Sequence, residues 1–460
     1  MKRIACLGIF FGLSAYLIAQ SYQPTWESID KRPVPEWFIN AKFGIFIHWG
    51  LYSVPAWAPA NAPIDIYAKY AEWYWYRIRV NSGEEYKYFK AFNDSMYGKN
   101  STYQDFAGQF KAELFDPKQW AELFARSGAK YVVLTSKHHE GFCLWPSEQS
   151  WNWNSVDVGP HRDLAGDLTR AVKEKGLHMG FYYSLYEWFN PLYKNNLEKY
   201  VNDHMIPQMK DLVNRYQPDI FWADGEWDHT SDQWKSAEFL SWLYNESPVK
   251  DSVVVNDRWG KETRSVHGGY YTTEYDLGAD NKRIKPAASH PWEECRGIGT
   301  SFGYNRMEDL GSYLTSKALI GLLIEKVSAG GNLLLDIGPT ADGRIPVIMQ
   351  QRLLDIGDWL RVNGEAIYDT RAWIKGPKVP VTNIYFTRKG NDLYVICTEW
   401  PQKTITIPGV RSFSKTSLLG SSVKVSAKSN GTLTIQPPVV NPGNMPCQHA
   451  WVFKVEDFRD

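Results

Sequence analysis

Residues 218–227 read PDIFWADGEW, and this stretch sets the interpretation of the rest of the chain. An apolar run of this length suits a buried strand of a parallel sheet, and it ends abruptly at Asp224 and Gly225. Ligands of parallel α/β folds bind at the carboxyl ends of the strands, so a carboxylate between Trp222 and Trp227 indicates a chemical role. Asp also caps helices well, so this run alone leaves capping as an alternative for Asp224.

Five further apolar runs end in polar residues and are separated by helical patterns. They are FGIFIHWG (43–50), YVVLTSKHHEG (131–141), HMGFYYSLYEW (178–188), SVVVNDRW (252–259) and GNLLLDIGP (331–339). Amphipathic stretches such as 117–128 and 167–176 end in a glycine that can cap a helix. This alternation of strands and helices predicts an α/β fold, a (β/α)8-like (TIM-type) barrel.

Polar residues recur where the predicted strands stop, which suggests one site assembled at the carboxyl face of the barrel. They are His48, His138, His139, Glu187, Asp224 and Arg258. Neighbouring side chains on a regular strand face opposite ways. Both adjacent histidines can therefore reach a ligand only if the chain bends or bulges there.

The two ends of the chain differ from this central pattern. After Trp359 the sequence alternates in period two and is broken by Lys-Gly-Asn and Ser-Asn-Gly turns, so a small antiparallel β-sandwich is expected over 369–460, after a catalytic domain over 20–368. At the other end, Lys2 and Arg3, an apolar run and Ala19 predict a signal peptide over 1–19. We therefore expect export, either to the periplasm or out of the cell.

The composition excludes some classes of partner. Acidic and basic residues number 51 each, so neither nucleic acid nor an anionic membrane surface is an expected partner. No segment after the signal peptide is long and apolar enough for membrane insertion. The 21 tryptophans favour a carbohydrate ligand, because aromatic faces pack against the C–H faces of sugars.

Four cysteines follow the signal peptide, and their wide spacing predicts neither a zinc site nor a redox motif. They are Cys143, Cys295, Cys397 and Cys447. Export permits disulfides, but a domain of this size does not need them, so buried free thiols are the preferred interpretation.

Ordered motifs along almost the whole mature chain resemble the retaining α-L-fucosidases of glycoside hydrolase family 29. They include WFINAKFGIFIHWGLYSVPAW, EWYWYRI, SKHHEGFCLWPSEQSWNWNSVDVGPHRDL, GFYYSLYEWFNPLY, FWADGEW, VNDRWG, HGGYYTTEY, WEECRGIGTSFGYN and GGNLLLDIGPTADGRIP. The resemblance implies an exo-acting enzyme that removes terminal α-L-fucosyl residues from a fucosylated oligosaccharide or glycoconjugate. It implies no cofactor and no metal, and it leaves the oligomeric state open.

Family resemblance also implies two catalytic carboxyl groups, since a retaining glycosidase needs a nucleophile and an acid/base about 5 Å apart. Asp224 matches the nucleophile, and Glu226 is its rival within the same motif. Glu293, in WEEC, matches the acid/base, which the family places on a variable loop. Its neighbour Glu294 is expected to point elsewhere, and Glu274 in TTEY is a further alternative.

The remaining residues implied by the resemblance recognise the sugar. His48, Glu72, Trp73, His138, His139, Tyr182 and Arg258 are expected around the fucose ring. Phe46, Trp222 and Phe302 are expected to form an apolar wall for the C6 methyl group. Many relatives have tryptophan where this chain has Phe302, so a smaller ring stands at that position. Asp336 and Asp342 are assigned to a strand end and a tight turn, outside the site.

Three other functions remain as alternatives. The first is a related α-L-galactosidase, whose substrate differs by one hydroxyl at C6. The second is a fucose-binding protein without catalytic activity. The third is a metal-dependent hydrolase that uses the histidines and Asp224 as ligands, although the chain lacks a spaced motif such as HxH or HExxH.

Overall fold

A computed structural model describes residues 21–80, 83–277, 290–377 and 382–460. The predicted signal peptide over 1–19 lies outside these residues. Eight parallel strands form one sheet in the order β5-β4-β3-β2-β1-β8-β7-β6. The strands are β1 (Phe43–Ile47), β2 (Tyr131–Lys137), β3 (His178–Ser184), β4 (Ile220–Asp224), β5 (Val254–Val255), β6 (Tyr271–Glu274), β7 (Trp292–Gly297) and β8 (Asn332–Ile337). Backbone hydrogen bonds from Tyr270 to Val255 and from Gly269 to Asn256 bring the β5 and β6 edges together. The predicted barrel is confirmed.

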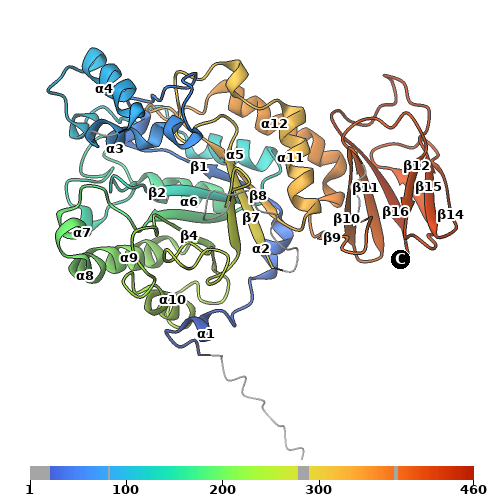
Figure 1. The fold of residues 1–460 in the computed structure, drawn as a ribbon, viewed down its shortest axis with the longest axis horizontal. Coiled ribbons are helices and arrows are strands. Elements are labelled where there is room, and N and C mark those ends of the chain that lie inside the picture. The colour runs from blue at the N-terminus through green and yellow to red at the C-terminus, as the bar shows by residue number, and fades with distance from the viewer. Residues whose placement is uncertain (1–20, 81–82, 278–289, 378–381) are drawn as a thin grey trace, which may run out of the picture.

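Amphipathic helices cover the outside of the sheet (Figure 1). The principal ones are α5 (Pro117–Arg126), α6 (Leu164–Glu174), α9 (Ile206–Tyr216), α10 (Ser236–Asn245), α11 (Ser316–Ser328) and α12 (Val347–Asn363). The other helices are α1 (Trp26–Ile29), α2 (Glu36–Ala41), α3 (Tyr74–Arg79), α4 (Glu84–Met96), α7 (Pro191–Asn195) and α8 (Leu197–Tyr200). Gly128 and Gly176 follow α5 and α6 with φ of 84° and 72°, as capping glycines do. None of the helices in the described ranges is both long and apolar enough to cross a membrane.

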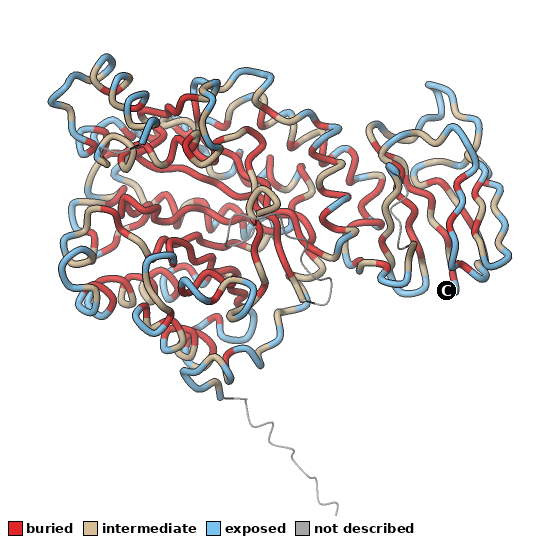
Figure 2. Tube along the Cα trace, in the orientation of Figure 1, coloured by how far each residue is buried: buried red, intermediate tan, exposed pale blue. Residues whose placement is uncertain are grey.

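The strand interiors are buried on both faces, so β1, β2, β4 and β8 consist of buried residues throughout (Figure 2). Alternate residues face the barrel axis and stack in layers. Gly44 of β1 is one of these, and an added Cβ would stand 2.2 Å from the ring of Tyr131 on β2. The missing side chain at Gly44 therefore makes room for a buried tyrosine in the lower barrel.

Strands β6 and β7 were not predicted from apolar runs. Their sequences, YTTE and WEECRG, alternate between the barrel interior and the outer face, and both faces are polar. On the outer face, Thr273 hydrogen-bonds to Glu294. Because Glu293 lies within β7, its expected place on a loop is wrong.

The C-terminal part forms two antiparallel sheets, in the orders β13-β16-β11-β10-β9 and β12-β15-β14. The strands are β9 (Arg371–Ala372), β10 (Ile384–Lys389), β11 (Asp392–Cys397), β12 (Ile405–Pro408), β13 (Lys415–Leu418), β14 (Ser426–Ser429), β15 (Thr432–Gln436) and β16 (Trp451–Glu456). The sandwich lies beside α11 and α12, and Trp359 Nε1 donates to the Ala450 carbonyl oxygen over 2.9 Å. The predicted sandwich is confirmed. Cys143, Cys295, Cys397 and Cys447 are free, as preferred from the sequence.

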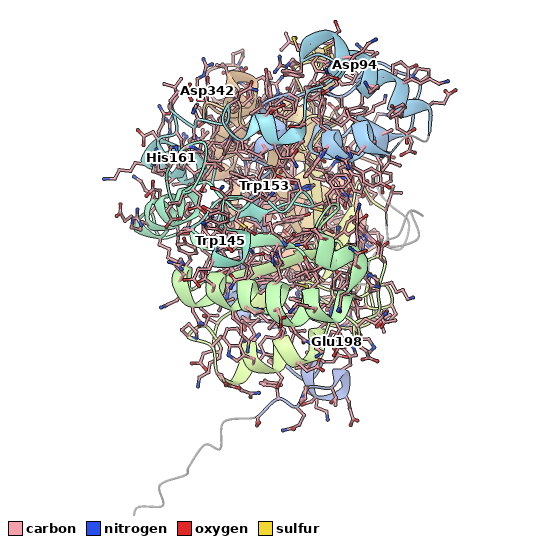
Figure 3. All side chains as sticks on the ribbon, turned by 90° about the vertical axis from the view of Figure 1, so that its left-hand side faces the viewer. Asp94, Trp145, Trp153, His161, Glu198 and Asp342 are labelled. Carbon is pink, nitrogen blue, oxygen red and sulfur yellow. The ribbon has the colours of Figure 1, made fainter. Side chains whose placement is uncertain are left out.

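On the face opposite the sandwich, tryptophans hold the segment between β2 and α6 in place (Figure 3). Trp145 Nε1 donates to Asp211 over 3.0 Å, and Trp153 Nε1 donates to the Glu140 carbonyl oxygen over 3.0 Å. Trp145 is fully buried. These contacts fix the chain that carries the paired histidines at the end of β2.

Candidate active site

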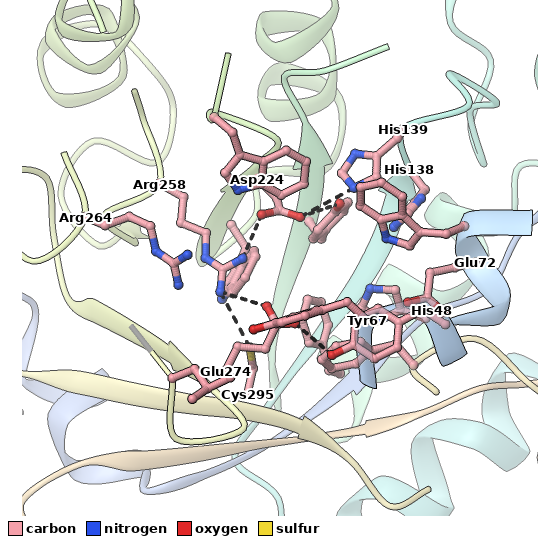
Figure 4. A pocket seen from close by; sticks show the side chains of 18 of the residues that line it. His48, Tyr67, Glu72, His138, His139, Asp224, Arg258, Arg264, Glu274 and Cys295 are labelled. Carbon is pink, nitrogen blue, oxygen red and sulfur yellow. Dashed lines mark hydrogen bonds and ion pairs between the residues drawn. The ribbon is translucent and has the colours of Figure 1, made fainter. Parts of the chain in front are cut away.

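A cavity of about 320 Å³ opens at the carboxyl ends of the strands (Figure 4). This volume is at the lower end of the range for small-molecule sites. The cavity is lined by Phe46, His48, Tyr67, Tyr70, Glu72, Trp73, Arg77, His138, His139, Tyr182, Trp222, Asp224, Trp227, Arg258, Arg264, Glu274, Leu277, Cys295 and Phe302. Every residue to which the family resemblance assigned a role in the site, except Glu293, is in this lining.

Asp224 is the last residue of β4, and two donors hold its carboxylate. Arg258 Nη1 donates to Oδ1 over 2.7 Å, and Tyr182 Oη donates to Oδ2 over 2.8 Å. Burial alone would raise the pKa of Asp224, but the Arg258 charge and the two hydrogen bonds outweigh it and lower the pKa. Asp224 is therefore an ionised carboxylate in a low-dielectric pocket, the state that a nucleophile needs. The Asp224 carboxylate is thus held by side chains of the cavity and does not cap a helix.

Glu226 follows Asp224 by two residues in the sequence but does not line the cavity. Gly225, with φ of 75°, turns the chain between them, and Glu226 is only 1% exposed. Burial raises the pKa of Glu226 to about 7. Asp224 is the carboxylate of this motif that faces the cavity.

The two adjacent histidines both line the cavity because β2 ends at Lys137, so His138 and His139 lie in the turn that follows the strand and not on the strand itself. The register shift of β2 against β3 lies before them, between Thr135 and Lys137. His139 Nδ1 lies 2.6 Å from Ser184 Oγ, and its Nε2 lies 3.9 Å from Asp224. Burial lowers the pKa of His139, which favours a neutral ring beside Asp224.

Polar groups outside the cavity orient His48 and Glu72. His48 Nδ1 lies 2.7 Å from Asp336 Oδ1, and burial lowers the pKa of His48 and raises that of Asp336. Glu72 Oε2 accepts a 2.9 Å bond from the Gly303 backbone, and burial raises the Glu72 pKa to about 7. Asp336 was left out of the site by sequence reasoning, and it acts on the cavity only through His48.

An aromatic floor closes the cavity. Trp222 stacks on Tyr182 with ring centroids 5.7 Å apart, and Phe46 lies 5.1 Å from Trp222. Phe302 packs 4.8 Å from His48 and is 5% exposed. The smaller ring at Phe302 thus still contributes to the apolar lining.

Glu293 lies beneath this floor and not in the cavity. Its Oε2 accepts a 2.6 Å bond from Tyr131 Oη, its Oε1 accepts a 3.0 Å bond from Trp222 Nε1, and the residue is fully buried. The register of β6 and β7 pairs Glu293 with Thr272, two residues below Glu274. Two residues along a strand span about 6.6 Å. The expected position of Glu293 beside the nucleophile is therefore wrong.

Glu274, at the end of β6, occupies the place expected for the second carboxyl group. Its Oε2 lies 3.3 Å from Arg258 Nη2, and its Oε1 accepts a 3.1 Å bond from Tyr70 Oη. Arg258 therefore contacts both Asp224 and Glu274 through its two terminal nitrogens. A retaining glycosidase needs its carboxyl groups about 5 Å apart, and two carboxylates on one guanidinium can meet this requirement.

Several other lining residues were missed from the sequence: Tyr67, Tyr70, Arg77, Trp227, Arg264, Leu277 and Cys295. The EWYWYRI motif had pointed to the segment that carries Arg77. Trp227 ends the PDIFWADGEW stretch, in which Trp222 and not Trp227 was expected to contact the sugar. No periodic signal marks Arg264 or Leu277, since both lie on loops.

Glu187, grouped with the other strand-end residues, belongs elsewhere. Its Oε1 lies 2.5 Å from Lys137 Nζ and 2.9 Å from His204 Nε2, and all three side chains are buried. This cluster lies behind β2 and β3, and none of its members lines the cavity. In the described ranges, no group of three or more His, Cys, Asp or Glu side chains has the geometry to hold a metal ion.

Comparisons with known proteins agree with this arrangement. A family model described as Alpha-L-fucosidase matches residues 11–365, and one described as Alpha-L-fucosidase C-terminal domain matches residues 380–456. An alpha-L-fucosidase of Dictyostelium discoideum is 44% identical over 459 residues, which are 95% of this chain and 96% of that protein. The tissue alpha-L-fucosidase of Homo sapiens is 44% identical over 446 residues, which are 94% of this chain and 91% of that protein. A crystal structure of Thermotoga maritima alpha-fucosidase in complex with fucose has 37% identity and a TM-score of 0.78, and the match covers 94% of this chain and 100% of that one.

Proposed function

This chain belongs to the alpha-L-fucosidase family of glycoside hydrolases, and we propose that it releases terminal α-L-fucose by a two-step retaining mechanism with Asp224 and Glu274 as its two catalytic carboxyl groups. The family and the hydrolytic activity follow from the matches along nearly the whole chain. The mechanism and the roles of the residues rest on the geometry of the cavity.

In the first step, Asp224 attacks C1 of the fucosyl residue while Glu274 donates a proton to the departing glycosidic oxygen. The C1–oxygen bond breaks, and a bond from C1 to Asp224 Oδ forms with inversion. Arg258 and Tyr182 keep Asp224 ionised until it reacts. Glu274 leaves this step as a carboxylate, which the Arg258 guanidinium stabilises.

In the second step, Glu274 takes a proton from a water molecule, and the water oxygen attacks C1. The bond from C1 to Asp224 breaks, so the two inversions together release α-L-fucose and restore both carboxyl groups. The single observation that carries this proposal is the contact of Arg258 with both Asp224 and Glu274. It places two carboxyl groups at one end of the barrel with a donor between them.

We propose that His48, Glu72, His138 and His139 recognise the fucose hydroxyl groups, since each presents polar atoms to the cavity. Trp73 lies against His139 with ring centroids 5.3 Å apart and extends this wall. The apolar surface of Phe46, Trp222 and Phe302 is suited to the C6 methyl group. An α-L-galactoside adds one hydroxyl at C6, and an apolar pocket rejects such an analogue by about 100-fold at most.

We also propose that the protein is exported, on the basis of the signal-peptide pattern at residues 1–19. Expression of the full-length gene with an antibody against the sandwich tests this. Mature protein that starts near residue 20 outside the cytoplasm supports export. Unprocessed protein confined to the cytoplasm contradicts it.

Two measurements test the mechanism. Proton NMR of an early reaction mixture should show α-L-fucose as the first product, with the β anomer appearing later by mutarotation. A 2-deoxy-2-fluoro-α-L-fucosyl fluoride should label one active-site peptide, and mass spectrometry should place the label on Asp224. First-formed β-L-fucose, or a label elsewhere, would overturn the proposed mechanism.

A further inference from the structure

Arg264 is a cavity-lining residue that the mechanism does not use. It lies in the stretch between β5 and β6, which contains no helix, and its side chain borders the cavity together with Arg258 and Leu277. Its Nε and Nη2 are shielded from solvent, and neither has a hydrogen-bond partner among the residues the structure describes. Buried polar groups of this kind are rare, because an unmet donor costs free energy.

The other two arginines of the cavity have partners. Arg258 bonds to Asp224 and Glu274, and Arg77 Nη1 donates to Glu85 over 2.7 Å. No ion pair to a described carboxylate engages Arg264, whereas Arg77 pairs with Glu85 and Arg258 pairs with Asp224. Among the three cavity arginines, Arg264 is therefore the one without an ion pair to a described residue.

Glu226 is the carboxyl group that most directly opposes this charge. Its pKa is raised to about 7 by burial, an effect that the Arg264 charge reduces, yet its own Oε2 has no hydrogen-bond partner in the described part of the chain. The two groups attract each other without a direct hydrogen bond. Glu226 does not line the cavity, so the Arg264 guanidinium is the member of this pair that a ligand in the cavity would meet.

The position of Arg264 indicates which part of a substrate it meets. Figure 4 shows its guanidinium beside Arg258, on the side away from His48 and Glu72, the residues proposed to hold the fucose ring. Arg258 contacts Glu274 and is the arginine beside which Arg264 lies, so Arg264 and Glu274 border the same part of the cavity. Glu274 faces the leaving oxygen in the proposed mechanism, and the leaving sugar extends on that side.

We propose that Arg264 forms a subsite for an anionic substituent, a carboxylate or a sulfate ester, on the sugar that leaves when the fucosyl bond is cleaved. A guanidinium binds such groups through two parallel, charge-assisted hydrogen bonds. Because Nε and Nη2 are shielded from solvent, the ligand would meet the part of the Arg264 guanidinium that borders the cavity. This inference rests on the proposed function, because it assumes that Glu274 marks the leaving-group side.

A matched pair of substrates isolates the charge. One is an aryl α-L-fucoside with a carboxylate on the leaving ring, and the other is its methyl ester. The wild-type enzyme should prefer the carboxylate, with a kcat/KM ratio of about tenfold at low salt, and 0.5 M NaCl should reduce this ratio. The Arg264→Gln variant should bring the ratio close to one. Arg77→Gln, which changes the other peripheral arginine, should keep the wild-type preference.

Natural linkages separate the two sources of charge. The substrates are fucosides of a uronic acid, of a sulfated hexose and of the neutral hexose. The kcat/KM for one or both anionic sugars should exceed that for the neutral hexose. Equal kcat/KM for the acid and its ester in the wild-type enzyme would overturn the inference, as would a salt-insensitive ratio or an unchanged ratio in Arg264→Gln. The effect of salt on the kcat/KM ratio is measured on the wild-type enzyme, so that test does not depend on the folding of a variant. Hydrolysis of the methyl ester tests the proposed function itself, so the failure of that function and the failure of the subsite are distinguishable.

Discussion

The indole Nε1 of Trp222 donates a 3.0 Å hydrogen bond down to Oε1 of Glu293, while Asp224, two residues along the same strand, faces the cavity above. The floor of the active site thus lies between the nucleophile and the glutamate that the WEEC motif had suggested. Glu293 accepts hydrogen bonds from Trp222 and Tyr131, and Glu274 is the cavity carboxyl group that shares Arg258 with Asp224.

The first prediction concerns the buried position of Glu293. Burial raises its pKa to about 7, whereas an unfolded glutamate has its pKa near 4.5. Between these values the folded protein keeps a proton that the unfolded chain releases, so stability falls as pH rises from 4.5 to 7. Glu293→Gln removes this loss, and the variant should gain on the order of 1–3 kcal/mol relative to wild type between pH 5 and pH 7.5.

Thermal unfolding of both proteins across this pH range measures the difference. Glu238→Gln, which changes an exposed residue of α10, is the control and should follow the wild-type curve. Glu293→Gln should also retain most of the wild-type kcat/KM. A loss of turnover by several orders of magnitude with an intact fold would return the acid/base role to Glu293.

The second prediction concerns the donors around the nucleophile. Arg258 and Tyr182 lower the pKa of Asp224, and activity requires the ionised carboxylate. Removing the arginine in Arg258→Met should raise that pKa, so the acidic limb of the kcat/KM profile should move to higher pH. Tyr182→Phe removes one neutral hydrogen bond and should shift the acidic limb of the kcat/KM profile by less than Arg258→Met does. The surface variant Arg215→Met should leave the limb in place, and an unmoved limb in Arg258→Met would contradict this account.

The third prediction concerns the buried ion pair behind the cavity. Lys137 is fully buried and bonds to Glu187, so Lys137→Met leaves a buried carboxylate with His204 and Asn190 as its remaining side-chain partners. This change should destabilise the protein by about 3–5 kcal/mol, and the double variant Lys137→Met/Glu187→Leu should recover much of it. Chemical denaturation of Lys137→Met, Glu187→Leu and the double variant measures the three free energies of unfolding that a double-mutant cycle needs. Additive losses, without recovery in the double variant, would show that the pair is not coupled.

The fourth prediction concerns the packing of the lower barrel. An alanine at position 44 would place its Cβ 2.2 Å from the Tyr131 ring, whereas Gly321 of α11 has open space around it. Gly44→Ala should lower the melting temperature through overpacking worth about 1–3 kcal/mol, while Gly321→Ala should raise it slightly. Equal melting temperatures for the two variants would contradict the tight contact.

The fifth prediction separates the carboxylate mechanism from metal-dependent hydrolysis. Prolonged treatment with EDTA, followed by gel filtration, should leave the turnover of an aryl α-L-fucoside unchanged. Loss of activity that zinc restores would favour the metal-dependent alternative.

Much of the barrel was predictable, because its apolar strands are buried on both faces and their sequences carry little else. The cavity residues at the ends of these strands, Asp224 and the two histidines among them, followed from the same pattern. Strands β6 and β7 gave no such signal. Their inward residues line or underlie a polar site, and Glu294 of β7 is bonded to Thr273 on the outer face.

The depth of Glu293 was not available from the sequence. Alternation along a strand predicts which of Glu293 and Glu294 faces inward, but not how far below the rim it lies. That depth depends on the register between β6 and β7, where Cys295 is level with Glu274 and Glu293 is level with Thr272. Register follows from packing around the whole barrel, so the sequence alone could not show that Glu274 lines the cavity and Glu293 does not.

Azide rescue of three alanine variants tests the central assignment most directly. With an aryl α-L-fucoside as substrate, azide should restore turnover of Glu274→Ala and yield α-L-fucosyl azide, because it attacks the fucosyl-enzyme in place of water. Azide should convert Asp224→Ala into a catalyst that yields β-L-fucosyl azide by a single inversion. Glu293→Ala should form no azide product. Rescue to α-L-fucosyl azide at Glu293→Ala, with none at Glu274→Ala, would contradict the assignment of Glu274 as the acid/base.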